Sequence, residues 1–269
     1  MKNPVRLAVS LAALCMVAGG LSGCLIIASD GGDRTVVAMP GEHLTATAED
    51  PYAAAIADPL RPAEEVVRDP LRHPSEMMSF AQLKAGDRVA DIRPEEVYFT
   101  RLFARAVGGS GRVYAFVPNQ TAGKEDAFGD TLAAAYPNVN RITGALETMT
   151  FPEPLDVVFM GQEYHDFTIP RFGVDVARMN AAVFAALKPG GLYVILDHQA
   201  APGAGISVSG TLHRIEGAEL RREVEAAGFV FAGETSAVAN PDDDHSLVVF
   251  DPAIRGKTDQ FVYRFRKPG

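Results

Sequence analysis

From residue 87 onward, short apolar runs of strand character alternate with longer segments of helical periodicity. Glycine, asparagine or a Pro-Gly pair follows each helical segment, as is usual where helices end. Strands that alternate with helices form a parallel sheet with helices on both of its faces. The expected strands are 87–92, 111–117, 139–143, 155–161, 190–197, 229–239 and 261–265, and the expected helices are 94–107, 124–136, 174–187 and 216–227.

The last two expected strands depart from this alternation. The segment between 229–239 and 261–265 is polar and has no convincing helical pattern. Parallel neighbours are usually joined by a helix, so these two strands are expected to pair antiparallel. The prediction is an α/β fold with a doubly wound, mostly parallel seven-stranded sheet and an antiparallel last strand. Within the polar segment, residues 242–244 are three aspartates without the spacing of a calcium loop, and they predict a solvated turn.

The first 23 residues have the character of an export signal. Lys2 and Arg6 form a short basic region, and the apolar run over 7–20 is too short to span a bilayer. The run leads into Leu21-Ser22-Gly23-Cys24, which resembles the bacterial lipobox. That resemblance implies a lipoprotein attached to the membrane through acyl chains on Cys24. Leu25 follows where an Asp would favour inner-membrane retention, which implies the outer membrane, facing the periplasm.

Length and composition bound the rest of the chain. With 269 residues, 47% apolar and 22% charged, the sequence fits one globular α/β domain with additional segments. We expect a signal peptide over 1–23, a tether over 24–57, a helical segment over 58–86 and the α/β domain over 87–269. The net charge of −9 argues against nucleic acid as a partner. Cys15 would leave with the signal and Cys24 would be lipidated, so thiol catalysis is excluded.

Several segments resemble a known enzyme family. Ala186-Leu187-Lys188-Pro189-Gly190-Gly191 and Ala227-Gly228-Phe229 resemble turns of class I S-adenosylmethionine-dependent methyltransferases. The pieces YFTRLFARAVG (98–108), YHD (164–166), TLHRIE (211–216) and RGKTDQF (255–261) resemble a bacterial group of exported predicted methyltransferases. With similar pieces elsewhere, the resemblance covers most of residues 58–267. It implies S-adenosyl-L-methionine as the cofactor and an unknown small-molecule or envelope component as the methyl acceptor.

The segment after the first expected strand departs from that family's pattern. The family has several glycines there, because the ligand lies against bare backbone. This chain keeps Asp91, Pro94 and Tyr98 but has Glu95, Glu96 and Val97 in place of the glycines. Val97 would be strained at positive φ, the three side chains would occlude the ligand's methionine end, and the glutamates would repel its carboxylate. A plain loop-to-helix joint, with Pro94 as the first helical residue, is the alternative.

The resemblance also assigns site residues. Cofactor contacts fall on Asp91, Tyr98, Thr100, Asn119, Gly161 and Gln162, with Asn119 where the family usually offers an acid to the ribose. Polar clusters follow the fourth and fifth expected strands, at 162–166 and at Asp197 and His198. Ligands of open α/β sheets bind at such strand ends, so both clusters are expected to face one cleft. His213 and Arg214 are expected to approach it from the following loop.

Three interpretations of these polar residues remain open. In the first, His165 or Asp166 is a general base and Tyr164 shapes the pocket. In the second, His165, Asp166, Asp197 and His198 hold a divalent cation, but their spacing matches no dedicated motif and no metal site is predicted. In the third, they cap strand ends and bond loop backbone.

For the protein as a whole, a methyltransferase and an inactive binding or structural lipoprotein both remain open. The rewritten loop favours lost or altered cofactor binding.

Overall fold

The structure is a computed structural model that describes residues 12–14, 25–28, 36–37, 50–94, 96–119 and 130–269. The chain forms two units, Met1–Glu49 and Asp50–Gly269. In the first unit β1 (Ala12–Leu14), β2 (Leu25–Ala28) and β3 (Val36–Val37) pair antiparallel in that order. Cys24 lies outside the described residues. Across the described part of the chain, every helix is too short or too polar to cross a membrane.

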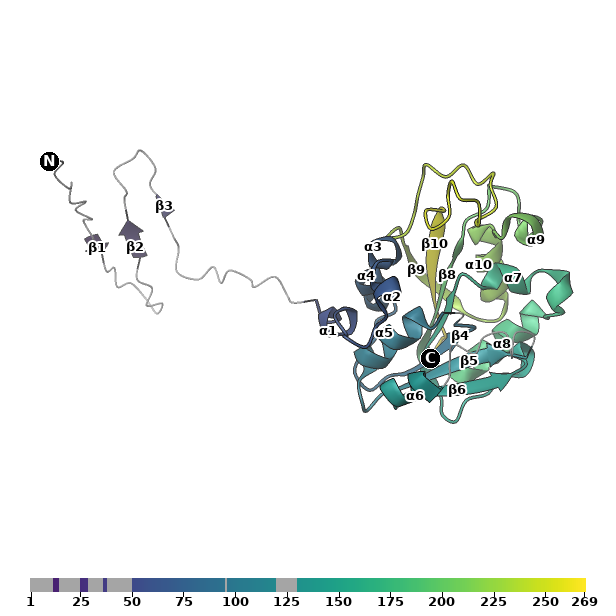
Figure 1. The fold of residues 1–269 in the computed structure, drawn as a ribbon, viewed down its shortest axis with the longest axis horizontal. Helices are drawn as coiled ribbons and strands as arrows, with labels where there is room; N and C mark the ends of the chain where they lie inside the picture. The colour runs from purple at the N-terminus through teal and green to yellow at the C-terminus, as the bar shows by residue number, and fades with distance from the viewer. Residues whose placement is uncertain (1–11, 15–24, 29–35, 38–49, 95, 120–129) are drawn as a thin grey trace. The chain divides into compact units, whose positions relative to one another are not determined.

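The second unit contains a seven-stranded mixed sheet (Figure 1). Its strands are β4 (Arg88–Ile92), β5 (Arg112–Pro118), β6 (Val139–Gly144), β7 (Leu155–Gly161), β8 (Leu187–His198), β9 (Val230–Thr235) and β10 (Gln260–Arg266). They lie in the order β6-β5-β4-β7-β8-β10-β9. Strands β4 to β8 pair in parallel, and β10 pairs antiparallel with both β8 and β9. The predicted α/β fold with its antiparallel end is confirmed.

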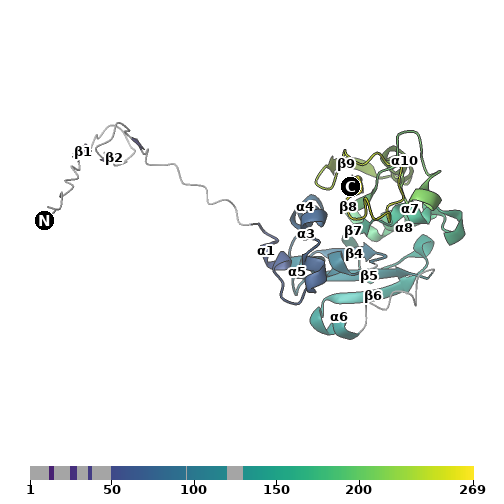
Figure 2. The same ribbon diagram turned by 45° about the horizontal axis from the view of Figure 1, so that its top comes forward.

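Helices cover both faces of this sheet (Figure 2). One apolar layer joins the sheet to α1 (Ala53–Ile56), α4 (Pro74–Phe80), α5 (Tyr98–Val107) and α6 (Asp130–Ala135). The other joins it to α7 (Tyr164–Phe167), α8 (Val176–Ala186) and α10 (Gly217–Ala226). Successive strand residues alternate between the layers, so Val157 and Phe159 of β7 face the first while Val158 and Met160 face the second. Burial on both faces explains why β7 is apolar at every position from Val157 to Met160.

Short helices complete the fold: α2 (Ala63–Val66), α3 (Asp69–Arg72) and α9 (Ser209–Leu212), with 3₁₀ turns at Leu146–Thr148 and Pro170–Phe172. Residues 50–57, expected to belong to the tether, are part of the compact unit. Their helix α1 contributes buried Ala55 to the core, and the Tyr52 hydroxyl donates a hydrogen bond of 3.0 Å to the Leu83 carbonyl. Of the helix expected over 124–136, residues 124–129 lie outside the described residues.

The helix expected to begin at Pro94 begins at Tyr98. Val97 precedes it as N-cap residue, at φ 54° and ψ 18°, in the left-handed region. Pro94 therefore is not the first helical residue, and the prediction of a plain loop-to-helix joint is wrong. The chain turns through a conformation that a β-branched residue rarely adopts.

The connection between β9 and β10 has no helix, as expected, but part of it is buried. The Asp243 carboxylate accepts a hydrogen bond of 2.8 Å from Nη2 of Arg214 and one of 2.7 Å from the backbone N–H of Asp259. Both Asp243 and Arg214 are buried. The prediction of a solvated turn is therefore wrong for Asp243, and Arg214 is used to anchor this connection.

Candidate functional site

A cleft of about 400 Å³ lies at the carboxyl ends of β4, β7 and β8. The chain leaves β4 toward β5 on one side, and β7 lies on the other, so this is the point where strand order reverses and where such sheets bind ligands. The volume suits a small molecule. The lining side chains that matter below are Arg68, Arg72, Asp91, Arg93, Glu96, Val97, Tyr98, Gln162, Glu163, His165, Asp166, His198, His213 and Phe250.

The loop after β4 keeps a backbone that glycine would favour. Arg93 has φ 50° and Val97 has φ 54°, and each such residue costs about 1–2 kcal/mol relative to a relaxed conformation. The strain predicted for Val97 is thus present. Its side chain is 1% exposed and belongs to the apolar layer under the cleft, which offsets the cost. Glu95 lies outside the described residues.

Glu96 is not an unpaired negative charge in the cleft. Its side chain is 58% exposed and forms an ion pair with Arg68, and Nη2 of Arg72 lies 4.0 Å from the same carboxylate oxygen. The expected repulsion of a ligand carboxylate is therefore offset at Glu96 by two cations. Arg72 is the more buried of them, and burial, with the charge of Arg68, lowers its pKa to about 10.

Arg93 crosses the cleft from the end of β4 toward the end of β7. Its guanidinium forms ion pairs with Glu163 and with Oδ2 of Asp166, the latter at 2.9 Å. All three residues are buried. The Arg93 side chain therefore occupies space beside β4, in addition to Glu96 and Val97, which also line the cleft.

Asp91 is a buried carboxyl group at the end of β4, only 3% exposed. Thr100 Oγ1 donates a hydrogen bond of 2.6 Å to its Oδ2. Burial raises the pKa of Asp91 to about 7, because the Thr100 hydrogen bond compensates only part of the lost hydration. Asp91 therefore changes charge near neutral pH, directly beside the cleft.

His165 and Asp197 form a buried pair. Nδ1 of His165 lies 2.7 Å from Oδ1 of Asp197, and the His165 backbone N–H donates to Oδ2 at 2.8 Å. Burial alone would disfavour the imidazolium, but the carboxylates of Asp197 and Asp166 outweigh it and raise the pKa of His165 to about 10. His165 is thus charged at neutral pH, which removes it as a general base in this state.

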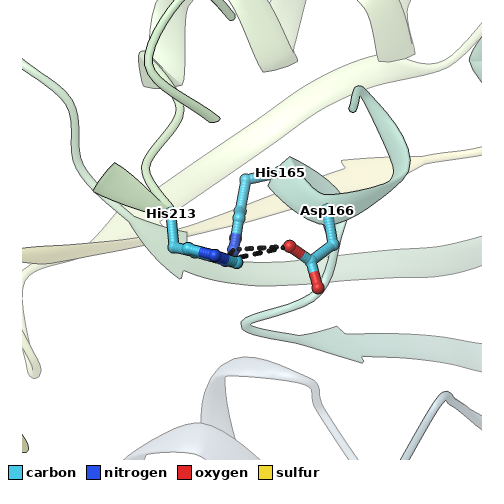
Figure 3. A group of neighbouring side chains, drawn as sticks. All are labelled: His165, Asp166 and His213. Carbon is cyan, nitrogen blue, oxygen red and sulfur yellow. Dashed lines mark hydrogen bonds and ion pairs between the residues drawn. The ribbon is translucent and has the colours of Figure 1, made fainter. Parts of the chain in front are cut away.

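His213 and Asp166 complete the polar end of the cleft (Figure 3). Nδ1 of His213 lies 3.0 Å from Oδ1 of Asp166 and 3.3 Å from Nε2 of His165. Against the effect of burial, His165 and Arg93 lower the pKa of Asp166, so it stays ionised. Burial lowers the pKa of His213, so this imidazole is neutral at neutral pH.

His198 differs from His165, although both contact Asp197. Its backbone N–H donates to Oδ1 of Asp197 at 2.7 Å, and its Nδ1 lies 2.8 Å from Oγ1 of Thr258. Burial lowers the pKa of His198 to about 3. Two histidines at one carboxylate therefore carry different charges.

The structure brings most of the predicted site residues together. Asp91, Tyr98, Gly161, Gln162, His165, Asp166, His198 and His213 line the cleft, and Thr100 contacts Asp91 from beneath it. Asn119 is exposed at the end of β5 and does not line the cleft. Tyr164 packs in the opposite layer, where its hydroxyl bonds Glu223 at 3.0 Å and Asn180 at 2.7 Å, so it does not shape this pocket. Arg214 is held elsewhere, by Asp243.

Three arginines of the cleft are not among the site residues predicted from the sequence. Arg68 and Arg72 belong to the helical segment before the sheet, and their approach to the cleft depends on tertiary packing. Arg93 had a usable signal, since it follows a strand end directly. The guanidinium of Arg72 lies over the ring of Tyr98, 4.8 Å from the ring centre. The Tyr98 hydroxyl in turn donates a hydrogen bond of 2.6 Å to Oδ1 of Asp69.

Comparison with solved structures gives the fold class. A methyltransferase from Aquifex aeolicus, described as dependent on S-adenosylmethionine, is 16% identical, with a TM-score of 0.53 over 74% of this chain and 92% of its own. YcgJ from Bacillus subtilis is 15% identical, with a TM-score of 0.52 over 74% of this chain and 99% of its own. The [4+2]-cyclase SpnF is 16% identical, with a TM-score of 0.54 over 73% of this chain and 81% of its own.

These similarities show that the chain has the Rossmann-like fold of S-adenosylmethionine-dependent methyltransferases. No protein-family model and no curated protein matches the sequence. One of the similar structures is a cyclase, so the fold alone does not decide the reaction. The chemistry must be argued from the cleft.

Proposed function

We propose that the cleft binds S-adenosyl-L-methionine and that the protein transfers its methyl group to a small acceptor. The observation that carries the proposal is a ligand-sized cleft at the ends of β4 and β7, in a fold shared with such methyltransferases. The residues present suit the cofactor. The loop keeps its left-handed turns at Arg93 and Val97, Asp91 supplies a carboxylate, and Arg72 supplies a cation. When bound, the cofactor provides an electrophilic methyl group on a cationic sulfur.

The charge of each side chain in the cleft indicates which part of the cofactor or acceptor it would bind. Ionised Asp91 is suited to accept hydrogen bonds from the cofactor's ammonium group, and Arg72 to pair with its carboxylate. At the other end, charged His165 is a hydrogen-bond donor for an acceptor oxygen, held in orientation by Asp197. Neutral His213 is the group placed to take a proton from the acceptor. The proposed general base is therefore His213, rather than His165 or Asp166 as predicted from the sequence.

A second candidate is a non-catalytic binding protein that keeps the fold. It is favoured by one observation, the ion pairs of Arg93 with Glu163 and Asp166 across the cleft. In this state a cationic side chain fills space beside β4 that a cationic cofactor would need. The two candidates differ in whether the cofactor can displace Arg93.

Calorimetric titration of S-adenosylmethionine separates them, with the natural protein beside Arg93→Gly. Glycine accepts the positive φ of position 93 without strain and clears the cleft, so we expect saturable binding by both proteins and affinity at least about tenfold higher for the variant. Gln82→Gly is the matched control, because Gln82 also has positive φ (55°) but does not line the cleft. Its affinity should equal that of the natural protein.

The other outcomes are equally decisive. Binding by Arg93→Gly alone would support the non-catalytic protein, with Arg93 as the group that closed the site. Absence of binding by both would exclude the cofactor from this cleft. Where the natural protein binds, formation of S-adenosylhomocysteine with a panel of oxygen and nitrogen acceptors tests transfer itself.

We further propose that the protein is anchored in the cell envelope, at the outer membrane facing the periplasm, by acyl chains on Cys24. The lipobox-like residues before Cys24 support this proposal. The natural protein should fractionate with membranes and carry an acylated N-terminal cysteine by mass spectrometry. Cys24→Ser should release it to the soluble fraction, and Cys15→Ser, the only other cysteine, should not. Equal distribution of all three proteins would contradict the anchor.

A further inference from the structure

Three polar side chains meet in the cleft wall with their nitrogen and oxygen atoms turned toward one another (Figure 3). His165 and Asp166 come from α7, and His213 follows α9. Nε2 of His165 lies 3.3 Å from Nδ1 of His213 and 3.3 Å from Oδ1 of Asp166, and Nδ1 of His213 lies 3.0 Å from the same oxygen. The three atoms thus form a nearly equilateral triangle.

The spacing of this triangle matches a metal site. Zinc binds imidazole nitrogen at about 2.0–2.1 Å and carboxylate oxygen at about 2.0–2.2 Å, which sets neighbouring donor atoms about 2.9–3.4 Å apart in octahedral or tetrahedral geometry. The three observed separations, from 3.0 to 3.3 Å, fall inside that range. Two histidines and one carboxylate, with further positions open, are a donor set typical of zinc and ferrous iron.

The orientation of His165 supports the same conclusion. Its Nδ1 lies 2.7 Å from Oδ1 of fully buried Asp197, so the proton on that nitrogen points at the carboxylate. A metal ion that binds here would displace the proton that His165 carries on Nε2 in the metal-free protein, and Nε2 would then direct its lone pair toward Asp166 and His213. A carboxylate behind a histidine is the usual outer contact of a metal-binding imidazole, because it fixes the tautomer and the ring orientation.

Asp166 provides a second, independent observation. Its Oδ2 accepts from Arg93 at 2.9 Å, but its Oδ1 is buried and has no hydrogen bond of good geometry. Asp166 is only 9% exposed, and the neighbours of this oxygen are the two imidazole nitrogens, at 3.0 and 3.3 Å. A cation held among the three atoms would satisfy the buried carboxylate oxygen more fully than these contacts do.

We propose that His165, Asp166 and His213 bind one divalent transition-metal ion, of the zinc type, in the wall of the cleft. The site shares His165 and Asp166 with the four residues considered from the sequence but has His213 in place of Asp197 and His198, since Asp197 supports a ligand and His198 bonds Thr258. All three ligands line the cleft, so an ion held by them would be within reach of a small molecule that binds there. If the proposed methyl transfer holds, the ion takes the place of His213 as the group that activates an acceptor oxygen.

The test measures metal rather than activity. The purified protein is stripped with a chelator and titrated calorimetrically with Zn²⁺, without S-adenosylmethionine, and with Mg²⁺ in a parallel titration. We expect one Zn²⁺ per chain with micromolar or tighter affinity, and at least about hundredfold weaker binding of Mg²⁺, which prefers all-oxygen sites. Co²⁺ should give the visible absorption of a low-coordinate nitrogen–oxygen site.

Two variants locate the ion. His213→Gly removes one ligand and suits the positive φ of 54°, and Asp166→Asn removes the carboxylate with little change in shape. Each should weaken Zn²⁺ binding at least about tenfold. His245→Gly is the matched control: His245 also has positive φ (63°), is similarly half-buried and pairs with a carboxylate, that of Asp259, outside the cleft. Its Zn²⁺ affinity should be unchanged.

Circular dichroism of each variant establishes that it is folded before the titration is interpreted. Substoichiometric Zn²⁺ binding by the natural protein, or unchanged binding in both His213→Gly and Asp166→Asn, would overturn the proposal. Failure of S-adenosylmethionine to bind would leave it standing, because the metal titration contains no cofactor.

Discussion

Asp91→Asn is expected to make the protein more stable at pH 8, by about 2–4 kcal/mol, and to leave its stability near pH 4 almost unchanged. The physical reason is the environment of this carboxyl group. Asp91 is 3% exposed at the end of β4, and Thr100 Oγ1 donates a hydrogen bond to its Oδ2. Asparagine keeps an oxygen that can accept this bond but never carries the charge that burial penalises.

The sign follows from the two pKa values. In the unfolded chain the pKa of Asp91 is the ordinary 3.8, and in the folded protein burial raises it to about 7. Stability from this group is therefore fully present below pH 3.8 and is lost as the pH rises through 7. Asparagine has no such loss, so the stability gap between variant and natural protein should widen from about pH 4 to pH 7 and then stay constant.

Urea denaturation followed by far-ultraviolet circular dichroism, at several pH values from 4 to 8, measures this gap. Thr100→Val is the companion variant, because it removes the donor that stabilises the ionised carboxylate. It should reduce stability most above pH 7. A gap between Asp91→Asn and the natural protein that does not change with pH would show that the pKa of Asp91 is not raised.

The same substitution should reduce affinity for S-adenosylmethionine by about tenfold or more, since Asp91 is the proposed partner of its ammonium group. A residue that destabilises the folded protein yet supports binding is the pattern expected of a functional site. Greater stability of Asp91→Asn without any loss of affinity for S-adenosylmethionine would show that Asp91 does not bind the cofactor.

The fold could be predicted from the sequence because its signals are local. Apolar runs such as 155–161 mark strands, and the glycines at 190 and 191 mark the turn into β8, where Gly190 has φ 79°. The start of α5 differs from the prediction, because Pro94 is a strong local signal while the left-handed turn at Val97 is imposed by packing. The burial of Asp243 also differs from the prediction, because it depends on Arg214, which lies far away in the sequence.

The candidate site could be predicted only in part. Strand ends placed Asp91, His165, Asp166 and His198 at one cleft, because parallel strands share a carboxyl edge. The triangle with His213 depends on how the loop after α9 folds back, and no spacing rule contains that information. The ion pairs of Arg93 likewise depend on a side chain that crosses from one strand end to the next. For this reason Arg93 was not predicted to occupy the cleft.

Arg214→Met is expected to reduce the free energy of unfolding by about 3–5 kcal/mol, the largest loss we expect from one substitution outside the cleft. The Arg214 side chain is 0% exposed. It donates to Asp243 at 2.8 Å, to the Gln199 carbonyl at 3.0 Å and to the Leu247 carbonyl at 3.1 Å. Methionine fills much of the volume but leaves a buried carboxylate and two carbonyl groups without their donor.

Arg221→Met on α10 is the control, because its ion pair with Glu225 is solvent-exposed and should be worth at most about 0.5 kcal/mol. Combining Arg214→Met with Asp243→Asn should recover part of the lost stability, since the uncompensated charge is then gone. Urea denaturation measures all four proteins. Equal losses for Arg214→Met and Arg221→Met would contradict the buried pair. Arg214 directly follows His213, so Arg214→Met should also weaken Zn²⁺ binding. The buried ion pair of Arg214 thus stabilises both the connection between β9 and β10 and the position of a proposed zinc ligand.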